Sequence, residues 1–398
     1  MKILVMSTTG HPEANLESAR HFMNHNSMID KIVILSSMAM QQQGKTQLLQ
    51  QSLEQICHIP LEILEIPDHW EESNMFALQN MLLNWINRHA PQDCFIFNVT
   101  GGTKLMSIAL DRASQILGSR RVECFYQSRD HKIVWYQRKT DQSVYPIHSH
   151  LDLQQRVNSR GYQITDLQAI TDVSVLELRY AQALIEKMQD DFQKGRQFCS
   201  LMNKLAALSD QQDCFTVQLS TMPLEQAEAI LILAQLHQEY FFQFDVESRT
   251  LTFKDESARA FVKGGWLEVY AGYECYKALV AVDHQAELAI NVTLRKNDTP
   301  NEMDVMFIHH AYLYCIECKT AKTMNSDTAK DVLYKLSALN DFGGLNQKRA
   351  VVSLYSLKTY NLTRAINSDI QVFQEREILN LSQHLQEWLI GNSSTLHP

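Results

Sequence analysis

The stretch NEMDVMFIHHAYLYCIECKT, residues 301–320, places charged residues inside what otherwise reads as two apolar strands. Residues 312–320 are rich in aromatic and β-branched side chains and alternate in polarity, which is typical of a strand. A second strand-like run covers residues 302–309. A tight turn at His310 and Ala311 would join the two runs into a hairpin, although this dipeptide lacks the usual Asn-Gly or Asp-Gly turn signal.

In this hairpin Asp304 and Glu317 are equidistant from the turn, so we predict that they are direct cross-strand neighbours. Lys319 shares the face of Glu317, because side chains two apart on a strand point the same way. Facing carboxylates repel unless a cation or a shared proton lies between them. Oxygen ligands suit Mg²⁺ or Mn²⁺, and the lysine could orient or help deprotonate an attacking water. The alternative is an exposed hairpin with solvated charges.

The elements around the hairpin predict an α/β domain. Ahead of it, residues 257–282 read as a helix and residues 286–295 as a strand. After it we expect a helix over residues 327–340, a strand over 349–355 and a final helix over 376–389.

The N-terminal region, residues 1–138, alternates short strands with helix-length segments, which predicts a doubly wound, Rossmann-like parallel sheet. The strand-like runs are KILVMS, KIVILSS, LEILEIP, CFIFNVT and VECFYQ. In the usual strand order the first and fourth strands are adjacent where the winding reverses, so the loops that follow them would share one crevice.

These two loops are rich in small polar residues and predict a site for a phosphate-bearing ligand. Paired glycines let backbone N–H groups approach an anion, and a hydroxyl, a lysine and a helix N-terminus add to the attraction. The alternative is a turn that needs glycine only for its backbone conformation. The absence of G-x-G-x-x-G disfavours a dinucleotide. The candidate binding residues are Ser7, Thr8, Thr9, Gly10, Thr100, Gly101, Gly102, Thr103 and Lys104.

Residues 39–46, AMQQQGKT, resemble a phosphate-binding P-loop with alanine in place of its first glycine. Three consecutive glutamines are poor material for a phosphate cradle, and the segment follows the second strand, away from the expected crevice. We interpret it instead as a flexible loop that closes over the ligand.

The middle of the chain, residues 139–256, is rich in helix-like sequence. Its end reads as a helix followed by a hairpin that turns near Ser248 and Arg249, which suggests a winged-helix-like module. The predicted helix carries Glu225, Glu228 and Glu239 but no Lys or Arg. Phosphate contact would therefore be poor, and a connector is favoured over a DNA-reading element.

Composition limits the protein's class and location. With 398 residues, 45% of them hydrophobic, the chain can form two or three domains. The first strand starts beside Met1 without a leader, and no apolar run is long enough to cross a membrane, so we expect a cytoplasmic protein.

The net charge of −9 argues against a basic surface that binds long duplex DNA. The eight cysteines read as reduced thiols, the odd-spaced pair Cys315 and Cys318 included.

The set Asp304, Glu317 and Lys319 resembles the D…ExK core of the PD-(D/E)xK nucleases. Glu268, in GGWLE, matches the acidic residue that this family often carries on its first helix. The proline of the family pattern is missing before Asp304. In the N-terminal region, TGGTK at residues 100–104 on a Rossmann-like fold resembles the CARF domain, which senses cyclic oligoadenylates.

The order of the two motifs resembles the CARF-containing nucleases of type III CRISPR defence. The resemblance implies a CARF domain (1–138), a connector (139–256) and a restriction-endonuclease-like α/β domain (257–398). It further implies a homodimer that binds one cyclic oligoadenylate, the tetra-adenylate, and a metal-dependent endonuclease that cuts single-stranded DNA or RNA, or nicks duplex DNA. Two alternatives stay open: a ring nuclease that cuts the cyclic ligand with Ser7, Thr8 and Lys104, and a DNA-binding regulator with a degenerate nuclease fold.

Overall fold

A computed structural model describes residues 1–24, 29–67, 70–128, 131–138, 144–147, 150–211, 214–219, 223–237, 240–282, 287–297, 299–322, 328–338 and 347–393. The chain folds into two compact units. Residues 1–163 belong to the first unit, and the described residues of 164–340 and 346–398 belong to the second.

The first unit contains a seven-stranded sheet in the order β3-β2-β1-β4-β5-β6-β7. Strands β1 to β5 pair in parallel, and β1 lies between β2 and β4, as predicted. The antiparallel strands β6 and β7 extend the sheet beyond the prediction. The strands are β1 (Lys2–Ser7), β2 (Lys31–Ser37), β3 (Leu61–Ile66), β4 (Cys94–Asn98), β5 (Val122–Gln127), β6 (Lys132–Gln137) and β7 (Val144–Pro146).

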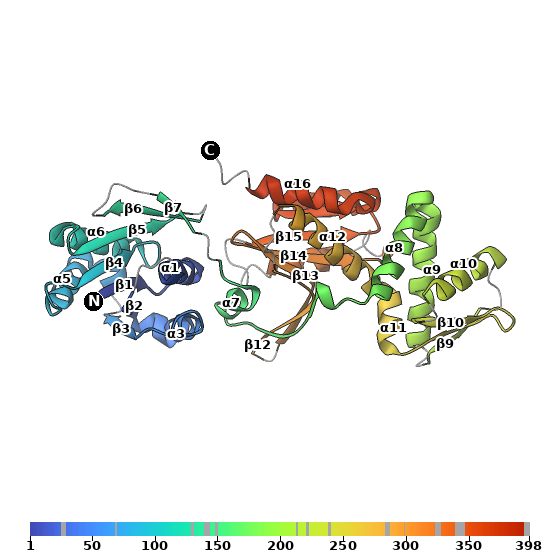
Figure 1. Cartoon of the computed structure of the whole chain (residues 1–398), viewed down its shortest axis with the longest axis horizontal. Helices are drawn as coiled ribbons and strands as arrows, with labels where there is room; N and C mark the ends of the chain where they lie inside the picture. The colour runs from blue at the N-terminus through green and yellow to red at the C-terminus, as the bar shows by residue number, and fades with distance from the viewer. Residues whose placement is uncertain are drawn as a thin grey trace. The chain divides into compact units, whose positions relative to one another are not determined.

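Helices cover both faces of this sheet, as the blue and cyan part of Figure 1 shows. Alternate residues of β1 enter opposite cores, because successive side chains of a strand point to opposite faces. Ile3 and Val5 pack in the core with α5 and α6, whereas Leu4 and Met6 pack in the core with α1 and α3. The helices are α1 (Glu13–Asn24), α2 (Met38–Gln42), α3 (Lys45–Ile56), α4 (Trp70–Ser73), α5 (Met75–Asn87), α6 (Lys104–Leu117) and α7 (Leu153–Asn158).

The second unit contains a mixed six-stranded sheet in the order β16-β15-β14-β13-β12-β8. The antiparallel run β12-β13-β14 continues through parallel pairs into β15 and β16. Helix α12 packs on β12, β13 and β14 and against α16. The elements are β8 (Gln163–Ala169), β12 (Glu287–Lys296), β13 (Thr299–His309), β14 (Tyr312–Lys319), β15 (Gln347–Ser353), β16 (Ile370–Gln374), α12 (Trp266–Val282), α13 (Thr328–Ala338), α15 (Thr359–Asn367) and α16 (Leu381–Ser393).

Several predicted boundaries in this unit need correction. The helix expected over residues 257–282 is three segments: α11 (Glu256–Ala260), a π-helical turn (Phe261–Gly265) and α12. Gly264 has non-helical backbone angles, which interrupts the helix there. The expected final helix begins as a 3₁₀ turn, Glu375–Asn380, before α16, and β15 ends at Ser353. Three predicted boundaries, at Ala286, Asp327 and Asn340, lie outside the described residues.

The helix-rich part of the second unit has its own three-stranded sheet in the order β10-β11-β9. The predicted helix and hairpin are present, with Arg249 in the left-handed region at the turn. Strand β8, which joins the six-stranded sheet from before this part, was not predicted. The elements are α8 (Val175–Asp190), a 3₁₀ turn (Ile170–Asp172), α9 (Phe192–Gln211), β9 (Thr216–Gln218), α10 (Leu224–Leu236), β10 (Phe242–Asp245) and β11 (Thr250–Phe253).

Candidate functional sites

The β13–β14 hairpin has the predicted two-residue turn. His309 pairs with Tyr312, so His310 and Ala311 form the connection, and His310 has a φ of 49°. The paired register runs to Val305 and Ile316. One residue further, the same register sets Asp304 opposite Glu317.

Asp304, Glu317 and Lys319 form one buried polar cluster. The Lys319 ammonium lies 2.8 Å from Oε1 of Glu317 and 3.6 Å from Oδ2 of Asp304. Oδ2 of Asp304 also accepts a hydrogen bond from the backbone N–H of Cys318 at 2.5 Å. The carboxylates are buried, whereas the Lys319 side chain is 30% exposed. The solvated-hairpin alternative is therefore wrong for the two carboxylates.

Glu268, on the first turn of α12, belongs electrostatically to this cluster. Burial and the charge of Asp304 raise the pKa of Glu268 to about 8. Burial and the charge of Glu317 raise the pKa of Asp304 to about 6. Burial by itself would lower the pKa of Lys319, but Asp304 and Glu317 outweigh it and raise that pKa. The three carboxyl groups of the cluster therefore carry more negative charge than the neighbouring ammonium charge neutralises.

Sequence analysis missed one member of the cluster. Lys335, on α13, places its ammonium 2.9 Å from both Oε1 and Oε2 of Glu317. The side chain of Glu317 is only 4% exposed, so it is enclosed by two lysines from different elements. No local spacing in the sequence links a helix residue to a strand residue 18 positions earlier.

The residues present fit a hard divalent cation. Asp304 and Glu317 are facing carboxylates with oxygen donors only, and their like charges need compensation. In the described part of the chain no three His, Cys, Asp or Glu side chains are grouped as a metal site. A pair of carboxylates nevertheless suits Mg²⁺ or Mn²⁺, because such ions keep several water or substrate ligands. The eight cysteines are free thiols and supply no competing cluster.

In the first unit, the loops after β1 and β4 meet, as predicted from the strand order. A Cβ atom at Gly102 would lie 2.9 Å from Cβ of Ser7, and one at Gly101 would lie 3.2 Å from the Ser7 carbonyl. Gly102 also has a φ of 85°. Glycine is therefore required here both by the close approach of the two loops and by the backbone conformation.

Buried amide side chains fix the two loops together. Nδ2 of Asn15 donates to the Ser7 carbonyl at 2.8 Å, and Nδ2 of Asn98 donates to Oδ1 of Asn15 at 3.0 Å. Oδ1 of Asn98 accepts from the N–H of Thr100 at 3.0 Å. The hydroxyl of Ser7 is buried and has no hydrogen-bond partner among the described residues.

The other candidate binding residues surround this junction. Thr103 caps α6, its side chain accepting from the N–H of Met106, and Lys104 begins the helix with an exposed side chain. Thr100 accepts from the N–H of Gln127 at 2.7 Å. Thr8 is buried, whereas Thr9 is partly exposed and Gly10 exposed. The helix N-terminus and Lys104 thus present positive potential beside the glycine loop.

The interpretation of residues 39–46 as a loop away from the crevice is wrong. Residues 39–42 lie in α2, Gly44 turns the chain, and α3 begins at Lys45. The buried hydroxyl of Thr46 lies 3.3 Å from that of Thr8 and 2.5 Å from that of Ser36. Gly44, with a φ of 70°, turns the chain so that α3 places Thr46 beside the first loop.

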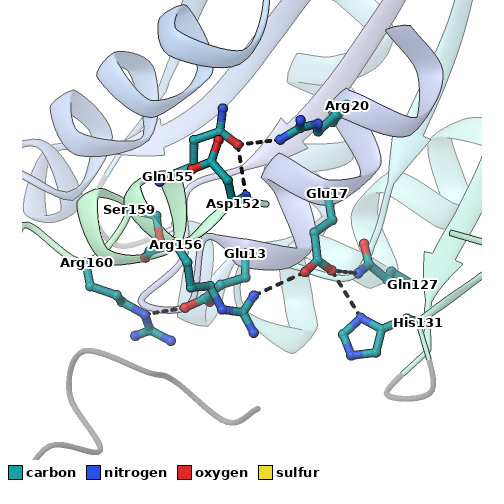
Figure 2. A network of polar contacts seen from close by, with 10 residues as sticks. All are labelled: Glu13, Glu17, Arg20, Gln127, His131, Asp152, Gln155, Arg156, Ser159 and Arg160. Atoms are coloured by element: carbon teal, nitrogen blue, oxygen red, sulfur yellow. Dashed lines mark hydrogen bonds and ion pairs between the residues drawn. The ribbon is translucent and has the colours of Figure 1, made fainter. Parts of the chain in front are cut away.

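A buried polar network joins α1 to α7, and sequence analysis missed it (Figure 2). Glu17 is 1% exposed and accepts from Arg156 at 3.1 Å, from His131 at 3.2 Å and from Gln127 at 2.7 Å. Burial would raise the pKa of Glu17, but His131 and Arg156 outweigh it and lower that pKa to about 2.

The same network reaches the first candidate loop. Arg160 pairs with Glu13, donates to the Gly10 carbonyl at 2.9 Å and lies 2.7 Å from Nδ1 of His11 (Figure 2 shows its pairing with Glu13). A second link from α1 joins Arg20 to Gln155. Residue 160 is therefore tied to the loop that follows β1.

Two family descriptions match the sequence. Residues 11–162 match the Card1 CARF domain, and residues 255–391 match the Card1-like endonuclease domain. No curated protein matches at a significant level. Among the described residues, no helix is long and apolar enough to span a membrane.

Solved structures share the fold over nearly the whole chain. The protein VC1899 from Vibrio cholerae is 18% identical, with a TM-score of 0.80 and 98% of both chains covered. Can2 from Sulfobacillus thermosulfidooxidans, solved with cyclic tetra-adenylate, is 20% identical with a TM-score of 0.74, covering 98% of this chain and 99% of that one. A type III CRISPR defence DNA nuclease activated by cyclic oligoadenylate is 12% identical with a TM-score of 0.52, covering 89% of this chain and 45% of that one.

Proposed function

Because the chain belongs by both of its matched domains to the Card1-like CARF nucleases, we propose that it is a metal-dependent endonuclease activated by a cyclic oligoadenylate. We place its activity in type III CRISPR antiviral defence, with single-stranded DNA or RNA, or nicked duplex DNA, as substrate. The similarity in fold to a nuclease activated by cyclic oligoadenylate supports this assignment.

The observation that carries the proposal is the buried cluster of Asp304, Glu317 and Lys319. A degenerate nuclease fold that served only as a regulator would not need to bury two facing carboxylates, because burying like charges together costs stability even where lysines pair with them. The cluster retains every residue type that metal-assisted phosphodiester hydrolysis requires.

Asp304 and Glu317 would hold Mg²⁺ or Mn²⁺, and Glu268, whose pKa responds to the charge of Asp304, would add a further carboxylate contact. When bound, such an ion supplies Lewis acidity and lowers the pKa of coordinated water. Lys319 would orient the attacking water and donate hydrogen bonds to the phosphate oxygens, because its ammonium already lies beside both carboxylates.

The proposed activator is cyclic tetra-adenylate, bound by the loops after β1 and β4. The Gly101–Gly102 turn, the hydroxyl of Thr103 and the Lys104 ammonium offer donors to its phosphates. A ring with repeated identical units suits a twofold-symmetric homodimer in which each subunit offers the same loop. Activation then requires that the active arrangement bind the ring better than the resting one.

The decisive experiment is a cleavage assay with and without cyclic tetra-adenylate. Labelled single-stranded DNA, single-stranded RNA and supercoiled plasmid are incubated with the chain in Mn²⁺, Mg²⁺ or EDTA. We expect cleavage only with both activator and metal. Incubating the activator alone with the Glu317→Ala variant tests the ring-nuclease alternative, because that activity would persist and destroy the ring.

A further inference from the structure

The contact between Lys335 and Glu317 conflicts with metal binding at the same carboxylate. Each carboxylate oxygen offers about two lone-pair sites. Oε1 of Glu317 already faces two ammonium groups, those of Lys319 and Lys335, and Oε2 faces Lys335. These contacts occupy three of about four lone-pair sites, so a divalent cation that binds Oε1, or both oxygens, must displace a lysine.

Lys335 is the lysine that can leave. Lys319 lies on the same strand as Glu317 and is also within 3.6 Å of Asp304, so it keeps a carboxylate partner. Lys335 comes from a helix, its side chain is 34% exposed, and Glu317 is the acceptor that it contacts in the described part of the chain. Its flexible four-carbon side chain lets the ammonium move out toward solvent when a cation takes its place.

We propose that Lys335 is a second catalytic lysine, which leaves Glu317 when the divalent cation binds and then contacts the scissile phosphodiester. The inference rests on the proposed nuclease function. The displaced ammonium has three N–H donors and stays within reach of the site, where the phosphate brings the acceptors that Glu317 no longer offers.

Charge favours this exchange. Before the cation arrives, three carboxyl groups, with that of Glu268 counted, face the two ammonium groups of Lys319 and Lys335. A divalent cation then leaves the cluster positive, which suits the single charge of a phosphodiester and the second negative charge that develops during attack.

The chemical step itself leaves the lysine intact. A water oxygen bonds to phosphorus after giving a proton to solvent, while the bond from phosphorus to the leaving sugar oxygen breaks and that oxygen takes up a proton. Lys335 donates hydrogen bonds to a non-bridging phosphate oxygen throughout. No bond to its nitrogen forms or breaks.

The test compares Lys335→Met with Lys330→Met in the whole 398-residue chain. Lys330 lies on the same helix, and its ammonium contacts the ring of Tyr334 instead. Mn²⁺ binding is measured without nucleic acid by electron paramagnetic resonance of the free ion. Because the competing ammonium is gone, we expect Lys335→Met to bind Mn²⁺ about tenfold more tightly. Residues that contact metal ligands alter metal affinity on this scale.

Cleavage is then measured at saturating Mn²⁺ and activator. We expect Lys335→Met to cut about 100-fold more slowly, as when one transition-state donor is removed, and Lys335→Arg to recover part of the rate. Lys330→Met should resemble the wild type in both measurements. A merely structural lysine would instead leave Mn²⁺ binding unchanged or weaken it.

Unchanged or weaker Mn²⁺ binding by Lys335→Met, or an undiminished rate at saturating Mn²⁺, would overturn the inference. If Lys335→Met fails to fold, Lys335→Gln is judged by the same two criteria. A wild-type chain that binds Mn²⁺ but cuts no nucleic acid would overturn the proposed function and the phosphate contact with it. If the wild type cuts nucleic acid but Lys335→Met does not bind Mn²⁺ more tightly, only the inference is overturned.

Discussion

The two units each bury a glutamate-centred cluster, and the clusters differ in how their charge is balanced. In the first unit, Glu17 has Arg156, His131 and Gln127 as partners, and its pKa is lowered to about 2 (Figure 2). In the second unit, the pKa values of Asp304 and Glu268 are raised to about 6 and about 8, because burial and like charges act together.

Under the proposed function, the difference separates a structural cluster from a reactive one. A carboxylate with enough donors keeps its charge and ties elements together, as Glu17 ties α1 to α7. Carboxylates left with excess negative charge instead create a place for a cation. Four predictions test this distinction and a fifth tests the proposed activator site; they run from the largest expected effect to the smallest.

Glu317→Ala should lower activator-dependent cleavage by about 10³-fold or more, because it removes an oxygen ligand from the proposed metal site. Cyclic tetra-adenylate binding should persist, since the candidate binding loops belong to the other unit. Cleavage is measured on labelled single-stranded and supercoiled substrates, and binding by calorimetry. Cutting at the wild-type rate would remove Glu317 from the site.

Glu17→Gln should destabilise the first unit by about 3 kcal/mol at pH 7, because Arg156 is left buried without its charged partner. Because the pKa of Glu17 is lowered, the stability that its charge contributes is fully present above pH 4.5 and is lost as pH falls toward about 2. Hydrogen exchange of peptides from α1 measures the local stability.

The wild type and Glu17→Gln should therefore converge in stability at strongly acidic pH. Glu54→Gln, an exposed change on α3, is the matched control and should alter stability by less than about 0.5 kcal/mol. A Glu17→Gln protein as stable as this control at pH 7 would contradict a structural role for the cluster.

Lys319→Ala should lower cleavage by about 100-fold while Mn²⁺ still binds, because the lysine acts on water and phosphate and the carboxylates remain. Rates at saturating Mn²⁺ and Mn²⁺ affinities are measured side by side. Loss of Mn²⁺ binding together with rate would assign Lys319 to holding the carboxylates in place instead.

Lys104→Ala should weaken cyclic tetra-adenylate binding by about tenfold, because an exposed cation at a helix N-terminus attracts phosphate. Calorimetry measures the affinity, and Arg120→Ala, in the same unit beyond the end of α6, is the control. Equal affinities for all three proteins would exclude this helix end from the binding site.

Asp304→Asn should flatten the pH dependence of stability in the metal-free second unit between pH 4 and 7. A raised carboxyl pKa costs stability as pH rises through the interval between its unfolded and folded values, here from 3.8 to about 6. Urea unfolding in EDTA gives the comparison. Parallel curves for wild type and variant would contradict the charge imbalance.

Local patterns in the sequence were enough to predict the hairpin and the glycine loops. The distance of Asp304 and Glu317 from a two-residue turn fixes their register, and Gly101–Gly102 after a buried strand marks the switch point of the sheet. Each prediction depends on residues close in sequence or on a general rule of strand order.

The missed residues depend on packing between distant elements. Lys335 reaches Glu317 from α13, and Arg156 reaches Glu17 from 139 positions away. A lone Lys or Arg on a helix usually has a solvated side chain, so neither sequence position indicated burial or pairing. Strand β8 was missed for a related reason, since its sheet neighbour β12 follows more than a hundred residues later.

The tight β13–β14 hairpin has a consequence for the order of folding. Only 14 positions separate Asp304 from Cys318, whereas 83 separate Asn15 from Asn98 at the junction of the candidate binding loops. Hairpins close in about 1–10 μs, while parallel sheets built from distant segments form more slowly. We therefore expect Asp304 and Glu317 to meet early in folding, before the loops after β1 and β4 come together.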